Sequence, residues 1–162
     1  MTEVSDTADS FAIYMEDEVG LTDSFYLTPG VRYNYHTVDM TSDSDKLDKS
    51  WNNVSFALAA KYLVTEQWTL QASATQLFKG PALRETYVNY NSTFDPNLKA
   101  ETGLNTEVGV GYVENNIIGL DHLGFSTTLF KTDLNDYIDD WSIGKKQVLV
   151  VMRMKTLVIM KS

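Results

Sequence analysis

The feature that most constrains the fold of this chain is one very long run of alternating residues. Over residues 25–38 the odd positions are mainly apolar and aromatic, and the even positions are largely polar. A period of two is typical of a β-strand with two different faces. The run is about 14 residues long, whereas strands of globular proteins average about 5 to 6 residues and membrane-spanning strands need about 9 to 11. Its length therefore favours a strand that crosses a membrane.

Similar alternation recurs along the chain. It predicts further strands over residues 51–64, 68–78, 103–112 and 123–138, and a less regular one over 11–19. Together these segments predict an all-β fold, an antiparallel up-and-down meander of about six long strands. Several aromatic residues fall toward strand ends, where the aromatic girdle of a membrane barrel would lie. They are Tyr33, Tyr35, Tyr62, Trp68 and Tyr112.

The connections between the predicted strands alternate in length. Residues 20–24 and 65–67 are short turns, whereas 40–50 and 79–100 are long polar loops. Outer-membrane barrels have short turns on one side of the membrane and long loops on the other. The connection at 114–122 is longer than this rule predicts for its side. The pattern leaves a soluble β-sandwich open as an alternative, a surface binding module, because its faces alternate too.

Composition and motifs disfavour several functional classes. The net charge of −9 argues against nucleic acid as a partner, because phosphate binding needs a basic surface. The chain has no cysteine, so disulfides and thiol chemistry are excluded. It also has no Gly-x-Ser-x-Gly, His-Glu-x-x-His or phosphate-binding glycine loop. We therefore expect no enzyme activity, no catalytic residue, no metal site and no intrinsic cofactor.

The two ends of the chain differ in character from its middle. We predict a disordered start over residues 1–10 and a partial barrel over 11–144. Residues 145–162 contain five basic side chains and no acidic one. We interpret this basic and apolar tail as anomalous and not native to the barrel.

Two short motifs resemble a known family. The first is Phe78-Lys79-Gly80-Pro81, which with the following 83–87 resembles the Phe-Arg-Ala-Pro box and the Leu-x-Glu-x-Tyr continuation of TonB-dependent receptors. The second is Asp95-Pro96-Asn97-Leu98, which resembles their Asn-Pro-Asn-Leu box. Residues 25–33 are similar to the family's Leu-x-Leu-x-Pro-Gly-Leu-Arg-Tyr strand. The resemblance covers residues 11–143 and rests on the order and spacing of the motifs.

The resemblance implies an active importer in the outer membrane of a Gram-negative bacterium. Such a receptor has a 22-stranded barrel and a plug, so this chain would be an open section of barrel that is not transport-competent alone. The implied partners are the lipid bilayer with lipopolysaccharide, the TonB complex only through the plug region, and a small-molecule iron ligand or a haemoprotein. The transported ligand would be haem or a ferric siderophore. Residues 82–94 lack the histidine of the haem-receptor branch, but tyrosine can ligate haem iron, so both ligands stay open.

Candidate ligand contacts lie in the loop between the two motifs and on one strand. They are Arg84, Tyr87, Tyr90, Asn91 and His36. For His36, on the polar face near the outer end of its strand, the simpler alternative is a polar residue of the barrel interior. For Arg84, beside Glu85, the simpler alternative is a structural ion pair or a loop anchor.

Overall fold

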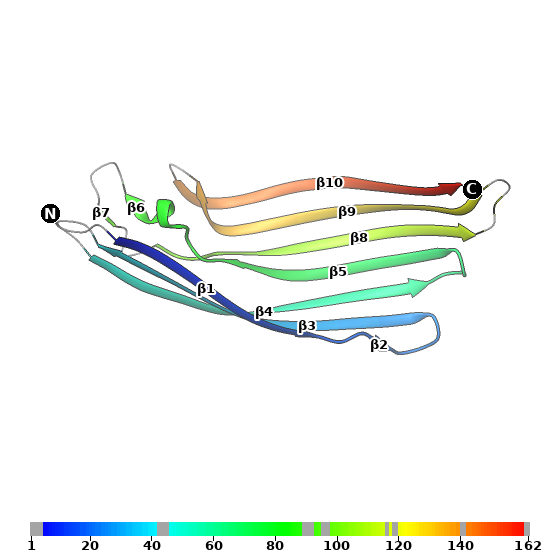
Figure 1. The fold of residues 1–162 in the computed structure, drawn as a ribbon, viewed down its shortest axis with the longest axis horizontal. Helices are drawn as coiled ribbons and strands as arrows, with labels where there is room; N and C mark the ends of the chain where they lie inside the picture. The colour runs from blue at the N-terminus through cyan, green and yellow to red at the C-terminus, as the bar shows by residue number, and fades with distance from the viewer. Residues whose placement is uncertain are drawn as a thin grey trace.

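The computed structural model describes residues 5–41, 46–88, 93–94, 98–115, 117, 120–139 and 142–160. They form an antiparallel sheet in which neighbouring strands follow the order β1-β3-β4-β5-β8-β9-β10, with the short β2 beside β3. Figure 1 shows this sheet as an open, elongated meander. The predicted fold class is thereby confirmed, although the sheet has more strands than the six expected.

The long strands run far beyond the length usual in globular proteins. Their bounds are β1 Ser5–Glu16, β3 Phe25–Thr41, β4 Lys46–Leu63, β5 Trp68–Lys79, β8 Glu101–Asn115, β9 Leu120–Asp139 and β10 Ser142–Met160. The shorter elements are β2 Val19–Gly20, the 3-10 helix η1 Leu83–Thr86, β6 Tyr87–Val88 and β7 Thr93–Phe94. The predicted strands at 25–38, 51–64, 68–78, 103–112 and 123–138 all lie within these long strands or within one residue of them.

The strand register places the apolar positions of neighbouring strands on one common face of the sheet. Strands β3 and β4 pair from Phe25↔Tyr62 to Thr41↔Lys46 without a register shift. The apolar face includes Ile13, Phe56 and Val108, which are 62%, 59% and 56% exposed. The polar face includes Arg32, Asn34, Ser55, Lys61, Gln71 and Glu107.

The exposure of the apolar face distinguishes between the two predicted architectures. A soluble sandwich buries that face of each sheet beneath a second sheet. Among the described residues the second sheet is only the two-stranded pair β6-β7, and the apolar face stays exposed. A face of this size in contact with water is rare for soluble proteins, whereas a membrane barrel places it against lipid. No helix in the described part of the chain is long and apolar enough to cross a membrane.

Aromatic side chains form a row on the apolar face near the short turns. The rings of Trp68 and Tyr112 lie 4.8 Å apart, and Phe125 stacks on Tyr112 at 5.5 Å. Tyr33 and Tyr35 lie further along β3, eight to ten residues from Phe25. At about 3.3 Å per residue and a strand tilt of about 40°, this separation spans roughly 20 to 25 Å across the membrane, close to the apolar band of about 25 Å in such barrels.

The structure describes part of each end of the chain. Strand β1 begins at Ser5, which pairs with Thr41, so the expected disorder up to residue 10 is wrong for residues 5–10. The tail forms most of β10, which pairs with β9 but with three register shifts. No such shift interrupts the pairings β3–β4, β5–β8 or β8–β9. The tail thus continues the sheet, but with a poorer register than the other strands; that it is not native to the barrel stays a prediction.

Candidate functional site

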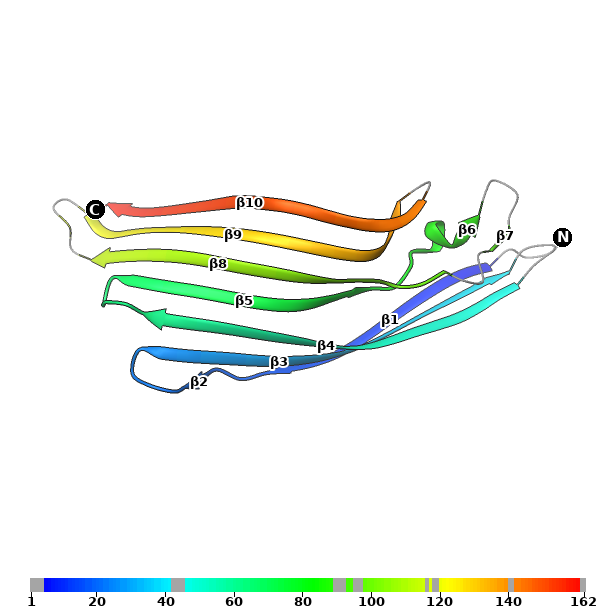
Figure 2. The ribbon, with the colours of Figure 1, turned by 180° about the vertical axis from the view of Figure 1, so that it is seen from behind.

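The outer ends of β1, β3 and β4 extend beyond the apolar band as a three-stranded ribbon. We call residues 5–10, 36–41 and 46–51 the outer extension. Figures 1 and 2 both show it at the same end of the sheet as η1, β6 and β7. Val38 and Met40 are fully buried there, against Trp51 and Leu83. A small apolar core therefore fixes η1, immediately after the first motif, onto the outer extension.

His36 connects the outer extension to the first motif. It lies on the polar face of β3 and is 9% exposed. Its Nδ1 lies 2.8 Å from the Ser10 hydroxyl oxygen of β1, and its Nε2 lies 2.8 Å from the Pro81 carbonyl oxygen. The ring also covers Gly80, where an added Cβ would overlap the imidazole. Both ring nitrogens are thus occupied within the chain, and the first motif packs directly on this side chain.

Trp51 makes the equivalent connection to the second motif. It is the cross-strand partner of His36 in the β3–β4 pair, and the two rings lie 5.8 Å apart. Trp51 Nε1 donates a hydrogen bond of 3.3 Å to the Leu98 carbonyl oxygen, and Lys49 Nζ donates one of 2.9 Å to the same oxygen. We call residues 80–98 the motif loop. Both of its ends are therefore held by neighbouring positions of one hairpin.

A group of charges holds the motif loop from its other side. Lys79 Nζ lies 2.9 Å from Glu85 Oε1 and 3.6 Å from Glu101 Oε1. Glu85 also accepts a hydrogen bond from the Ala82 amide, and the buried Glu101 accepts one from the Ile138 amide of β9. Glu85 thus acts as a loop anchor through Lys79 and the Ala82 amide, whereas the predicted pair with Arg84 lies outside the described side chains. Lys79 ends β5 outside the apolar band; partial burial lowers its pKa, but Glu85 and Glu101 outweigh burial and raise it above the ordinary value of 10.5.

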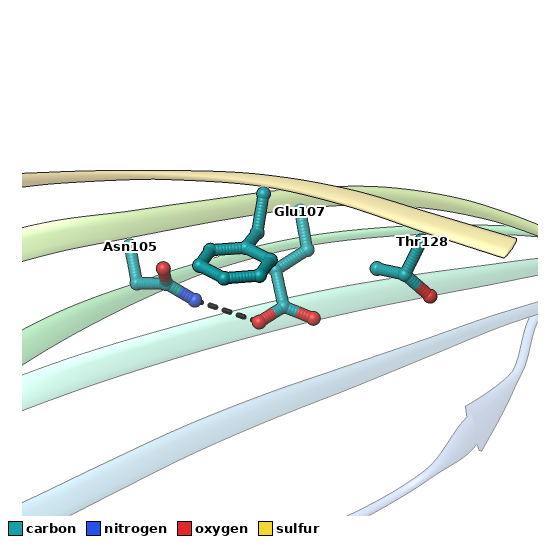
Figure 3. A pocket seen from close by; sticks show the side chains of 4 residues that line it. Asn105, Glu107 and Thr128 are labelled. Atoms are coloured by element: carbon teal, nitrogen blue, oxygen red, sulfur yellow. Dashed lines mark hydrogen bonds between the residues drawn. The ribbon is translucent and has the colours of Figure 1, made fainter. Parts of the chain in front are cut away.

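The polar face below this site forms a hydrogen-bonded wall. Asn105 donates to Glu107 at 2.8 Å, and Thr132 donates to Asn105 at 2.7 Å. Asn105 and Glu107, together with Thr128 and Phe130, line a shallow hollow of about 150 Å³, seen in Figure 3. Nearer the turns, Lys61 pairs with Glu18 at 2.8 Å. Such a face suits the interior of a barrel, because its polar groups are partnered and open to water.

The residues predicted from the sequence fall into three groups. Those that the structure brings together are Gly80, Pro81, Leu98 and His36, while Phe78 and Lys79 end β5 just before them. Arg84 lies in η1 and Tyr87 in β6, but their side chains lie outside the described ones. Tyr90, Asn91, Asp95, Pro96 and Asn97 lie outside the described residues. Ligand contacts by these candidate residues therefore stay a prediction.

Sequence reasoning missed the partners that complete the anchors. Ser10 falls in the stretch predicted to be disordered, and Glu101 follows the second motif in a Lys-Ala-Glu-Thr stretch that gives no sign of its contacts with Lys79 and Ile138. Trp51 and Lys49 could have been found, since a tryptophan and a lysine next to a polar loop often bind a carbonyl group. Among the described residues, no three His, Asp or Glu side chains are grouped so that they could hold a metal ion.

Comparison with known proteins gives the family of this chain. Residues 2–143 match the family described as TonB dependent receptor-like, beta-barrel. The chain belongs to this family. Members of the TonB-dependent receptor family are transporters of the outer membrane of Gram-negative bacteria, so the chain is an outer-membrane protein. The predicted family and localisation are confirmed.

Individual relatives agree with the family. The chain is 27% identical over 151 residues to the ferric enterobactin receptor of Pseudomonas aeruginosa, which covers 83% of this chain and 18% of that receptor. It is also 27% identical over 121 residues to the ferrienterobactin receptor of Escherichia coli, covering 65% of this chain and 15% of that one. The chain thus spans less than a fifth of the curated relatives that it matches.

Solved structures show the same fold. The ferric-catecholate import receptor Fiu of Escherichia coli superimposes with a TM-score of 0.64 at 19% identity, over 96% of this chain and 29% of that one. The FrpB iron transporter of Neisseria meningitidis gives 0.66 at 19% identity, over 96% and 27%. At this identity the likeness establishes the barrel fold alone.

Proposed function

We propose that this chain is the section of an outer-membrane importer that presents part of its binding site for a ferric siderophore. The observation that carries the proposal is the motif loop, anchored at Pro81 and Leu98 to a hairpin that extends beyond the apolar band. A loop with fixed ends loses less conformational freedom when it binds a ligand.

A ferric catecholate is the siderophore class that we favour. The curated relatives are named as receptors for ferric enterobactin, and Fiu is named as a ferric-catecholate importer. Haem is the second candidate, because Tyr87 and Tyr90 lie in the motif loop and a phenolate can ligate haem iron. The absence of histidine from residues 82–94 supports the catecholate over haem.

Transport would require more strands than this sheet contains. In the described part of the chain β1 and β10 are the two edges of the sheet. Edge strands leave backbone groups without hydrogen bonds, and lipid cannot supply them. We infer that further strands and a plug complete the barrel, that the TonB complex acts through that plug, and that this section alone does not transport.

The test is ligand binding by the natural full-length chain in outer-membrane vesicles. We expect ferric enterobactin to quench protein fluorescence with an affinity at least about tenfold higher than that for haemin, a difference of about 1.4 kcal/mol. A haem absorption band that disappears with Tyr87→Phe or Tyr90→Phe would instead establish the haem alternative. Binding of neither ligand would overturn the proposal.

A further inference from the structure

The hydrogen bonds of His36 define what this side chain can do. A carbonyl oxygen only accepts hydrogen bonds, so Nε2 must carry a proton in order to bond to Pro81. In the neutral ring Nδ1 is then an acceptor, and the Ser10 hydroxyl donates to it. Neither nitrogen is left for a ligand. His36 therefore acts on the motif loop through one directed hydrogen bond, with the ring orientation fixed from β1.

The path of the chain makes this bond a long-range connection. Pro81 follows β5, and β5 neighbours β4 in the sheet, whereas His36 belongs to β3 on the far side of β4. The chain after β5 must therefore cross the polar face of β4 to reach His36. The contact between Gly80 and the imidazole shows how closely the two segments pack there.

We propose that His36 is a positioning residue that sets the place of the motif loop at the barrel mouth, with Trp51 as its counterpart at the other end. This inference rests on the proposed function, because the motif loop is taken as the ligand-contacting segment. His36 holds Pro81 and Trp51 holds Leu98. The two rings face each other across one strand pair. Both ends of the loop are therefore held at the same place on the β3–β4 hairpin.

Gly80 provides an independent way to disturb the same contact. A methyl group at position 80 would overlap the ring of His36. Gly80→Ala should therefore displace the loop when His36 is present, and should have little effect once His36→Ala has opened the space. If the effect of Gly80→Ala depends on whether His36 is present, the two residues pack directly against each other, because a general loss of stability would be the same in both backgrounds.

The test measures the position of the loop by distances between two spin labels. These 162 residues contain no cysteine, so once any cysteine elsewhere in the natural full-length chain is changed to serine, Ala82→Cys and Asp39→Cys, both at exposed positions, give unique labelling sites in outer-membrane vesicles. We expect His36→Ala to broaden the distance distribution, and His36→Gln, whose amide can still donate to Pro81, to restore most of it. Thr37→Ala, on the opposite face of the same strand, is the matched control and should leave the distribution unchanged.

Ligand affinity is the second measurement. His36→Ala should weaken ferric enterobactin binding about fivefold, the size expected for one hydrogen bond, and His36→Gln should recover it. An unchanged distance distribution in His36→Ala, or equal broadening by Gly80→Ala with and without His36, would overturn the proposal. If the unaltered chain binds no catecholate, the proposed function fails, while the distances still decide whether His36 positions the loop.

Discussion

His36 and Trp51 face each other across the β3–β4 pair with their rings 5.8 Å apart, and each donates a hydrogen bond to a carbonyl oxygen at a different end of the motif loop. The two acceptors, Pro81 and Leu98, belong to the two motifs that identify the family. The motifs are therefore brought together in space by a single hairpin that lies earlier in the chain.

Trp51→Phe keeps an aromatic ring, although a smaller one, but removes the donor to Leu98. Lys49 still bonds to this carbonyl, so we expect partial release of the second motif, worth about 1 kcal/mol. Tryptic cleavage after the exposed Lys99 should become about fivefold faster in outer-membrane vesicles. Trp68→Phe, in the aromatic row, should leave the rate unchanged; equal rates for all three chains would contradict the assigned role of Trp51.

Phe56→Lys places a charge on the face that we assign to lipid, where Phe56 is 59% exposed. A lysine near the bilayer midplane costs about 2 to 4 kcal/mol in such barrels. The free energy of unfolding in urea with lipid vesicles should fall by this amount. Gln71→Lys, on the polar face, is the matched control and should cost less than about 1 kcal/mol, because its charge stays in water. Similar losses for both substitutions would argue against the assignment of the faces.

The aromatic row should show coupling between its members. Trp68 contacts both Tyr112 and Phe125, at 4.8 and 5.7 Å between ring centroids. We expect Trp68→Leu and Tyr112→Leu each to destabilise the folded barrel. In a double-mutant cycle the combined loss should be smaller than the sum by about 0.5 to 1.5 kcal/mol, the contribution of one aromatic pair. Strict additivity in urea unfolding would show that the rings do not interact.

The raised pKa of Lys79 predicts a loss of stability at alkaline pH. A lysine whose pKa is higher in the folded than in the unfolded state stabilises the fold fully below its unfolded value, ordinarily about 10.5. This contribution declines as the pH rises through the higher folded value. The urea midpoint of the unaltered chain should therefore fall toward that of Lys79→Met in this range. Two curves that stay parallel throughout would exclude a role for the ion pairs with Glu85 and Glu101.

The sequence predicts the membrane-spanning part of the fold well, because a strand between lipid and water must alternate. Within the apolar band this requirement holds for every residue, as at Val54 and Phe56. The outer extension has no lipid on either side, so apolar residues are needed there only where it packs against η1, as at Val38 and Met40. Strand β1 begins at Ser5 in the stretch predicted to be disordered, and β4 begins at Lys46 within a predicted polar loop.

The candidate site can be predicted only in part from the sequence. The motifs and His36 are recognisable, but the role of His36 is not. Its partners lie 26 residues before it and 45 residues after it, and no local pattern encodes contacts at such separations. They appear only when the sheet register brings Ser10 opposite His36 and the chain after β5 folds back across β4.

The overlap between His36 and any side chain at position 80 has an evolutionary consequence. The box that the first motif resembles has alanine at its third position, where this chain has Gly80. Since an imidazole at position 36 leaves no room for that methyl group, the two positions cannot drift independently. We expect receptors that keep the alanine to have a side chain smaller than histidine at the position of His36. We also expect the alanine to be replaced by glycine before histidine appears at position 36.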